Sequence, residues 1–271
     1  MNTRKTSIFL IIIAIFLNTQ NTMASDLAKE KRWAEQITDS IMTGEAQSLT
    51  AKKVKFLSIY TPAETNKVLG GVILAHGLGV HPNWNDVILP LRSELPNFGW
   101  ATLSIQMPIL ANDAPLKDYL PLFDEVPARL DAAVQFFNSK NITNIVIVAH
   151  SLGSVMSVYY LSQNAKTPIQ ALVAIGMSSQ DFNDKLNVVK SLGKLKLPIL
   201  DLYGSRDLEL VIKSAASRAR AAKRAGNKNY TQTEVIGADH FFAQQDETLI
   251  LKVRSWLAKY APGVAIIKKE K

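Results

Sequence analysis

The stretch Asn144-Ile145-Val146-Ile147-Val148-Ala149-His150-Ser151-Leu152-Gly153-Ser154 decides the fold of this chain. An apolar run rich in β-branched residues stops at a serine and continues with helix-compatible residues, a pattern that predicts a strand, a sharp turn and a helix. Small residues at 149 and 153 flank the serine, so the backbone can bend tightly enough to lift the Ser151 hydroxyl above the edge of a sheet. The stretch is therefore typical of a nucleophile elbow.

One position departs from the usual G-x-S-x-G pattern, because the first glycine is replaced by Ala149. Its methyl group narrows the backbone angles available at the turn, but we expect it to be tolerated. A serine that caps a helix after a buried strand would give a similar sequence, since serine is a favoured N-cap residue. The motif therefore needs chemical partners elsewhere in the chain.

Length and composition indicate one substantial core. The chain has 271 residues, of which 47% are hydrophobic, and α/β folds of this size usually form one domain, here expected over residues 25–271. The chain contains no cysteine, which excludes disulfides, thiolate catalysis and cysteine metal sites.

Residues 1–24 differ in character from the rest. Two basic residues precede an uncharged run from Ile8 to Leu17, and Thr22 and Ala24 offer small side chains at the two positions that a signal peptidase reads. The segment predicts a signal peptide and a periplasmic or secreted protein, because the run is short for a membrane span. An uncleaved membrane anchor is the alternative.

The chain is basic. Removing Arg4 and Lys5 with the signal peptide lowers the formal net charge from +8 to +6. The excess gathers in 213–228 and 268–271, and the first cluster lies on an alanine-rich helix that carries Arg218, Arg220, Lys223 and Arg224. We interpret it as a solvated helix face, with a weak affinity for anionic envelope surfaces as the alternative. No aromatic residues alternate with these cations, so no nucleic acid partner is expected.

Apolar β-type runs alternate with helical periodicity along the chain. The expected strands are Val54–Tyr60, Gly71–Ala75, Trp100–Ile105, Asn144–Ala149, Ala171–Gly176, Leu197–Tyr203 and Thr231–Ile236. Leu27–Met42 is an amphipathic helix candidate expected on the outside of the domain. Runs that are apolar throughout are typical of parallel strands buried on both faces. The pattern predicts an α/β fold with a doubly wound, mostly parallel sheet and helices on both faces.

In such sheets, ligands bind and functional residues lie at the carboxyl ends of the strands. His76, Ser151, Asp207 and His240 each follow an expected strand directly or after a short turn. Four side chains that can act as nucleophile, acid or base are therefore expected at one edge of the sheet.

A serine hydroxyl needs a base to accept its proton. His150 precedes the turn and should point away from the serine, His76 leads into the turn at 77–79, and His81 lies in a polar loop. His240 follows the last strand and precedes the final helix, a position from which an imidazole can reach back to the serine. His240 is our candidate base.

The base in turn needs an acid that fixes its tautomer. Asp207 is our candidate, because its loop neighbours the His240 loop if the two strands pair in sequence; a helix N-cap is its other interpretation. Asp239 is too close along the backbone. Asp181 and Asp184 follow the preceding strand, and either remains open as the acid.

The motifs together resemble those of the α/β-hydrolase superfamily over roughly residues 54–260, and within it the chain resembles a little-characterised group of exported bacterial α/β-hydrolase-like proteins. The residues that carry the resemblance are His76-Gly77, Ala149-His150-Ser151-Leu152-Gly153, Gly204-Ser205-Arg206-Asp207 and Gly237-Ala238-Asp239-His240-Phe241. It implies Ser151 as nucleophile, His240 as base and Asp207 as acid. It also implies an oxyanion hole formed by the backbone N–H groups of Leu78 and Leu152.

The expected reaction is acyl transfer to water, most simply the hydrolysis of a carboxylic ester, on a small-molecule ester or acyl substrate. No H-E-x-x-H pattern and no G-x-G-x-x-G after a strand occur in the sequence, so neither a metal nor another cofactor is expected. A peptidase or acyltransferase with the same triad, and a non-catalytic exported binding protein on the same fold, are the alternatives.

The chain offers little room for a lid. The interval from Ser151 to Asp207 is short, so no large cap domain is expected there. The long connection Gln106–Pro121, rich in apolar residues, either walls an acyl pocket or packs over the core.

Overall fold

The computed structural model describes residues 25–164, 166–263 and 266–267. The expected signal peptide, residues 1–24, and the basic tail, residues 268–271, lie outside the described residues. The strands are β1 (Glu45–Ala51), β2 (Val54–Thr61), β3 (Lys67–Val68), β4 (Gly70–Ala75), β5 (Trp100–Ile105), β6 (Ile145–His150), β7 (Ile169–Ile175), β8 (Ile199–Arg206), β9 (Tyr230–Asp239) and β10 (Ile266–Ile267).

The helices alternate with these strands in the chain. The α-helices are α1 (Leu27–Thr38), α2 (Ile88–Glu94), α3 (Val126–Ser139), α4 (Leu152–Gln163), α5 (Val188–Leu192), α6 (Glu209–Arg224) and α7 (Asp246–Tyr260). Short 3-10 helices are η1 (Leu95–Phe98), η2 (Leu116–Tyr119) and η3 (Pro121–Asp124). Among the residues that the structure describes, no helix combines the length and the apolar composition of a membrane span.

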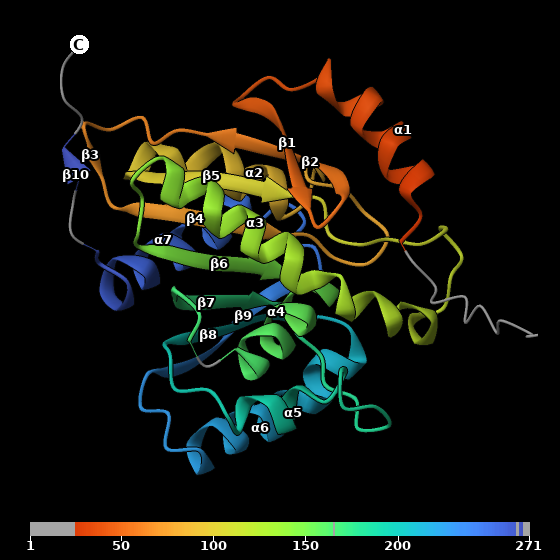
Figure 1. The fold of residues 1–271 in the computed structure, drawn as a ribbon. Helices are drawn as coiled ribbons and strands as arrows, with labels where there is room; N and C mark the ends of the chain where they lie inside the picture. The colour runs from red at the N-terminus through yellow and green to blue at the C-terminus, as the bar shows by residue number, and fades with distance from the viewer. Residues whose placement is uncertain (1–24, 165, 264–265, 268–271) are drawn as a thin grey trace, which may run out of the picture.

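One sheet of eight strands runs through the molecule in the order β1-β2-β5-β4-β6-β7-β8-β9 (Figure 1). β1 and β2 pair antiparallel, β2 also runs antiparallel to β5, and the remaining neighbours are parallel. The expected α/β fold with a mostly parallel sheet is confirmed. A separate two-stranded ribbon joins β10 to β3.

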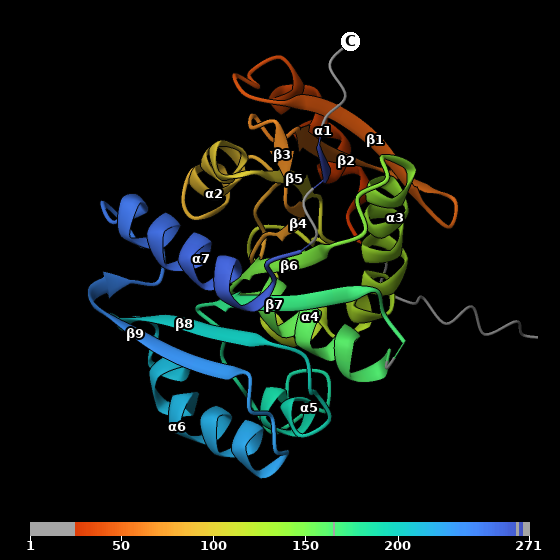
Figure 2. The ribbon, with the colours of Figure 1, turned by 90° about the vertical axis from the view of Figure 1, so that its left-hand side faces the viewer.

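Helices cover both faces of the sheet. Figure 2 shows α2 and α7 on one side of β6 and β7 and α3 and α4 on the other. Neighbouring residues of β4 divide between the two layers, since Ile73 belongs to the core under α3 and α4 whereas Val72 and Leu74 belong to the core under α2 and α7. Successive side chains of a strand point to opposite faces, so a strand between two helical layers must be apolar throughout.

All seven expected strands are present, with ends shifted by a few residues. The antiparallel edge strand β1 was not predicted from the sequence, because it reads Glu-Ala-Gln-Ser-Leu-Thr-Ala and is largely exposed. An edge strand with one neighbour needs no apolar run. The expected helix over residues 27–42 is α1, which ends at Thr38 and packs Ile37 against Leu57 and Ile59.

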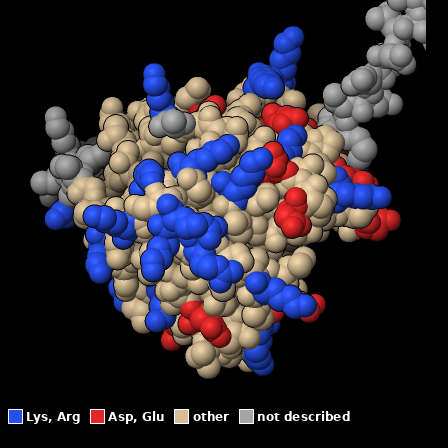
Figure 3. All heavy atoms as spheres, turned by 90° about the horizontal axis from the view of Figure 1, so that it is seen from below, with Lys and Arg blue, Asp and Glu red and all other residues tan. Residues whose placement is uncertain are grey.

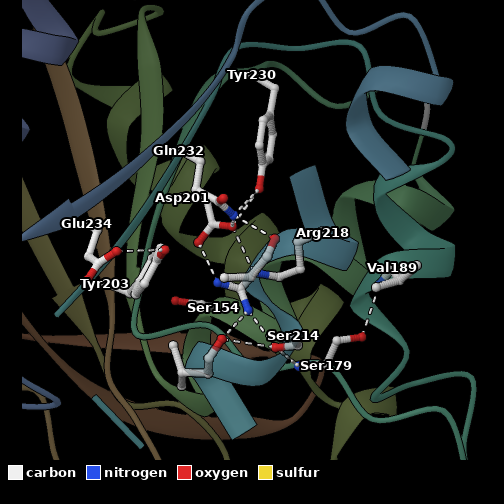
Figure 4. A network of polar contacts seen from close by, with 12 residues as sticks. Ser154, Ser179, Val189, Asp201, Tyr203, Ser214, Arg218, Tyr230, Gln232 and Glu234 are labelled. Carbon is white, nitrogen blue, oxygen red and sulfur yellow. Dashed lines mark hydrogen bonds and ion pairs between the residues drawn. The ribbon is translucent and has the colours of Figure 1, made fainter. Parts of the chain in front are cut away.

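A buried ion pair anchors α6 to the sheet (Figure 4). Arg218 Nε lies 2.7 Å from Asp201 Oδ2, and both side chains are fully buried. Tyr230 and Gln232 of β9 also donate to Asp201, at 2.5 and 2.8 Å. Our interpretation of Arg218 as part of a solvated basic face was therefore wrong: its spacing places it on the inner face of α6, where Asp201 compensates its charge.

The network continues into the loop that follows β7. Arg218 Nη1 donates to Ser214 Oγ at 2.5 Å, and the same oxygen accepts from the Ser179 N–H at 3.2 Å. Ser179 Oγ in turn accepts from the Val189 N–H at 3.1 Å. The ion pair therefore also ties α6 to the loop before α5.

The outer face of α6 remains basic. Figure 3 views the molecule from below Figure 1, over α5 and α6, where blue side chains gather. Exposed cations in these elements and the segments after them are Lys190, Lys194, Lys196, Lys213, Arg220, Lys223, Arg224 and Lys228. Lys190 pairs with Asp184 and Lys213 with Glu209, so the face keeps a positive excess.

Arg218→Met should destabilise the protein by about 3–5 kcal/mol, because Asp201 would remain as a buried charge without its cation. The matched control Arg220→Met, on the exposed side of α6, should change stability by about 0.5 kcal/mol or less. Urea unfolding measures both. An Asp201→Leu/Arg218→Met double variant should lose less stability than Arg218→Met alone. Equal small losses of stability in Arg218→Met and Arg220→Met would contradict the buried ion pair between Arg218 and Asp201.

Candidate active site

Ser151 lies at a strained turn between β6 and α4. Its backbone has φ 54° and ψ −123°, a conformation that residues other than glycine rarely adopt. The Ser151 N–H donates to the Ile175 carbonyl oxygen at 2.8 Å, which ties the turn to the end of β7. The expected strand, turn and helix are all present.

The two flanking small residues have different roles. A Cβ atom on Gly153 would lie 2.5 Å from the carbonyl oxygen of Ala75 and would also clash with that of His76, so only glycine allows α4 to approach β4 this closely. Ala149 is fully buried within β6 and is not among the residues with positive φ. Its methyl group is accommodated because this position is regular strand.

His240 lies between Ser151 and Asp207. Its Nε2 atom is 2.9 Å from Ser151 Oγ, and its Nδ1 atom is 2.6 Å from Asp207 Oδ1. An ionised carboxylate can only accept, so Nδ1 carries the proton toward Asp207, and Nε2 of the neutral ring accepts from the serine hydroxyl. The structure therefore brings together the three side chains that the sequence singled out.

The surroundings orient this arrangement. The Asp207 carboxylate accepts from the backbone N–H groups of Leu208 at 2.7 Å and Gly204 at 3.3 Å. A Cβ atom on Gly176, which has φ 60°, would lie 2.8 Å from His240 Cε1. The absence of a side chain there leaves space for the imidazole.

The alternative acids lie elsewhere. Asp181 and Asp184 are both exposed on the loop after β7, and Asp184 pairs with Lys190 at 2.6 Å. The contact to His240 comes from Asp207 at the end of β8 because β8 and β9 are parallel neighbours, which puts their carboxyl ends side by side.

His150 supports His240 from beneath. Its Nε2 atom donates to the His240 carbonyl oxygen at 2.9 Å, and the two ring centroids are 4.8 Å apart. Burial lowers the pKa of His150 to about 4, so the ring is neutral. His150 therefore acts as a hydrogen-bonding residue that holds the backbone of His240.

His76 clamps the turn that faces Ser151. Its Nε2 atom accepts from the Met107 N–H at 2.9 Å, so Nδ1 carries the proton and donates to the Gly77 carbonyl oxygen at 2.9 Å. Burial lowers the pKa of His76 to about 3. This clamp was not predicted, because it depends on the backbone after β5.

The two residues expected to form an oxyanion hole lie beside Ser151. A Cβ atom on Gly77 would be 3.0 Å from the Ser151 Cβ, so the turn lies against Ser151. Leu78 and Leu152 line one cavity with Ser151 and His240. Leu152 is the first residue of α4, where a backbone N–H has no partner within the helix.

This cavity has a volume of about 380 Å³ and is mainly apolar. Its walls come from the 76–79 turn, α4, the loop after β7 and the start of α6; the remaining lining residues are Leu116, Val155, Gly176, Ser178, Gln180, Leu186, Leu208, Glu209, Leu210 and Val211. In the described part of the chain, no cluster of three histidine, aspartate or glutamate side chains could hold a metal ion.

The connection 106–121 contributes little to this cavity. Of its side chains only Leu116 lines it. Met107, Ile109, Leu110 and Tyr119 are buried instead, so the alternative interpretation, that the connection packs over the core, describes it better. Apolar side chains in a long loop indicate burial but not which cavity they face.

Stability should fall as the pH drops from about 6.5 toward 4. The pKa values of His76 and His150 are lowered from 6.5 to about 3 and about 4, so the folded protein keeps both rings neutral where the unfolded chain binds protons. Stability is fully present above pH 6.5, and each ring should cost about 2 kcal/mol near pH 5. Urea unfolding of His150→Gln at several pH values should give a shallower pH dependence; an unchanged slope would contradict this account.

Comparisons with known structures show the same fold. Est1E from Butyrivibrio proteoclasticus aligns with a TM-score of 0.63 and 16% identity, over 80% of this chain and 99% of its own. The esterase Pf2001 of Pyrococcus furiosus aligns with a TM-score of 0.65 and 17% identity, over 83% and 95%. XC6422 from Xanthomonas campestris, described as an a/b serine hydrolase without lid, aligns with a TM-score of 0.61 and 16% identity, over 83% and 98%.

These neighbours are esterases and hydrolases, and at these identities the likeness shows the α/β-hydrolase fold. No curated protein matches the sequence. The family described as "Protein of unknown function (DUF3530)" matches residues 18–121 and 121–259, which is most of the chain. The chain therefore belongs to the DUF3530 family, and its fold is that of the α/β-hydrolase superfamily.

Proposed function

We propose that this protein is an exported serine hydrolase that cleaves carboxylic esters by acyl transfer. One observation carries the proposal: the His240 imidazole lies 2.9 Å from the Ser151 hydroxyl and 2.6 Å from the Asp207 carboxylate. A helix-capping serine has no need of a buried imidazole held by a carboxylate, whereas a nucleophilic serine needs both.

The proposed reaction has two halves. His240 Nε2 takes the Ser151 proton as the serine oxygen attacks the substrate carbonyl, and the N–H groups of Leu78 and Leu152 stabilise the oxyanion. The protonated imidazole, stabilised by Asp207, gives its proton to the leaving alcohol. A water molecule then attacks the acyl-enzyme with His240 again as base, which releases the acid and restores the serine.

The cavity supports an apolar acyl group as the substrate part. Leu152, Val155 and Leu186 are buried in its wall, while Leu78 and Leu208 are exposed at its rim. Burial of each methylene group from water contributes about 0.8 kcal/mol. Such a wall favours a small-molecule ester with a short to medium acyl chain over a charged acid.

The neighbouring structures agree with ester chemistry, since Est1E is also described with ferulic acid bound. Export remains part of the proposal, supported by the basic start, apolar run and small residues of 1–24. For the basic outer face of α6 we propose no more than a weak contact with anionic envelope surfaces.

Ser151 should react with a fluorophosphonate probe, and Ser151→Ala should abolish labelling. Ser151→Ala should lower kcat/KM on p-nitrophenyl esters by about 10³-fold or more, and Asp207→Asn by about 10⁴-fold through the wrong imidazole tautomer. Intact-mass analysis locates the label, and initial rates give kcat/KM.

Ser162→Ala, on the same helix as the elbow but outside the cavity, is the matched control and should label normally. A folded wild-type protein that stays unlabelled would refute the hydrolase and favour a binding protein. Labelling with turnover only on peptides or on added acyl acceptors would refute the ester assignment and favour a peptidase or an acyltransferase.

Leu186→Trp should shorten the preferred acyl chain. The added ring would fill part of the cavity of about 380 Å³, so kcat/KM should fall about tenfold or more for octanoate while acetate esters are affected little. A series of p-nitrophenyl esters measures the preference. Leu251→Trp, on the exposed face of α7, is the control, and an unchanged chain-length profile in Leu186→Trp would exclude this cavity as the acyl site.

A further inference from the structure

A buried polar cluster holds the first described residue of the chain. The backbone N–H of Ser25 donates to Glu125 Oε1 at 2.8 Å, and its hydroxyl donates to Glu125 Oε2 at 2.8 Å. Arg129 Nη2 donates to Ser25 Oγ at 3.0 Å. Only 6% of Ser25 is exposed, so a serine that leads into a surface helix is enclosed as a core residue would be.

The cluster carries more negative than positive charge. Arg129 binds both oxygens of Glu30 at 2.9 Å and lies 3.4 Å from Glu125. Two carboxylates therefore share one guanidinium. Arg129 is 1% and Glu30 5% exposed, whereas Glu125, at the edge of the cluster, is 29% exposed. Lys29 on α1 does not supply the second cation, because its ammonium binds the Leu110 carbonyl oxygen and the Asn112 side chain.

The environment of this cluster changes the pKa of Glu30. Its pKa is raised, mainly by burial and in part by the charge of Glu125, against the lowering effect of Arg129. A buried carboxylate without a full complement of cations is costly. A second cation beside Glu125 would offset the charge of Glu125 and so reduce this cost.

The expected signal peptidase site supplies such a cation. Thr22 and Ala24 are the small residues at the two positions that the protease reads, which puts the cut between Ala24 and Ser25. Hydrolysis of that peptide bond gives Ala24 the water hydroxyl and leaves an amine on Ser25, which binds a further proton near neutral pH because an α-amino group has an ordinary pKa of about 7.7–8.0.

We propose that the cluster formed by Glu30, Glu125 and Arg129 is a receptor for the processed amino terminus, in which the α-ammonium of Ser25 forms a partly buried ion pair with Glu125. The nitrogen is already at hydrogen-bond distance from the carboxylate. Cleavage converts a neutral amide contact into a charge-assisted one and balances the cluster as two anions and two cations.

Removal of the signal peptide thereby stabilises the folded protein, since the same cluster joins α1 to α3. The anchoring works through Arg129, which binds Glu30 of α1 and also donates to the Gln106 carbonyl oxygen at 2.9 Å. The proposal does not depend on catalysis by Ser151.

The first test compares two chains released from the same cleavable fusion. One begins at Ser25, and the other keeps Ala24, which moves the ammonium one residue away from Glu125. Urea unfolding measures the folding equilibrium constant of each chain. This constant should be larger by about tenfold or more for the chain that begins at Ser25. In Glu125→Gln the two chains should unfold alike, because the amide side chain keeps a hydrogen bond but lacks the charge.

Glu35→Gln is the matched control, because Glu35 lies exposed on α1, where it pairs with Lys31. It should leave the difference between the two chains intact. Equal stability of the two chains, or a difference that persists in Glu125→Gln, would overturn the proposal.

Two further measurements address the terminus itself. Intact-mass analysis of the full chain, exported with its own leader, should find Ser25 as the first residue, and a different first residue would overturn the assignment. Acylation by an activated ester near neutral pH should modify the Ser25 amine slowly in the native protein and rapidly in Glu125→Gln. Equal rates in both would mean that no ion pair protects the amine.

Discussion

The close approach of α4 to the end of β4 is the constraint on which the candidate active site depends. Gly153 makes it possible, because any side chain there would clash with the carbonyl oxygens of Ala75 and His76. The approach places the turn after β4 directly against Ser151, which itself adopts a strained backbone. A single missing side chain thus brings Ser151, the candidate nucleophile, and the backbone of Leu78 and Leu152 to one cavity.

The surrounding polar groups form a connected scaffold. His76 holds the Gly77 carbonyl and is itself held by the backbone N–H of Met107 and the side chain of Gln106. The carbonyl oxygen of Gln106 accepts from Arg129, the residue that also joins α1 to α3. Hydrogen bonds therefore run without interruption from the start of the described chain to the turn beside the serine, so the rigid placement of that turn and the docking of α1 share one buried cation.

Local sequence pattern predicted the buried elements, whereas contacts between distant residues decided the features that were missed. Strands buried on both faces were found because they are apolar throughout, as in Ile145–Val148, whereas the polar edge strand Glu45–Ala51 was not found. Arg218 was misread as solvated because its charge suggests exposure, and only the position of Asp201 on β8 shows otherwise. The connection 106–121 contains the short 3-10 helix η2, and its apolar residues face the core more than the cavity.

The sequence by itself determined the order of the buried strands and their helices, the sharp turn at Ser151 and the set of polar residues at the carboxyl edge. Each of these features depends on a few neighbouring residues, because their size, branching and polarity limit the local backbone conformation. The tertiary structure decided that Asp207, not Asp181 or Asp184, contacts His240, and that the cluster around Ser25 contains two carboxylates and one guanidinium. These features depend on which strands pair and which helices dock, that is, on contacts between residues far apart in the chain, and local pattern carries no information about such distances.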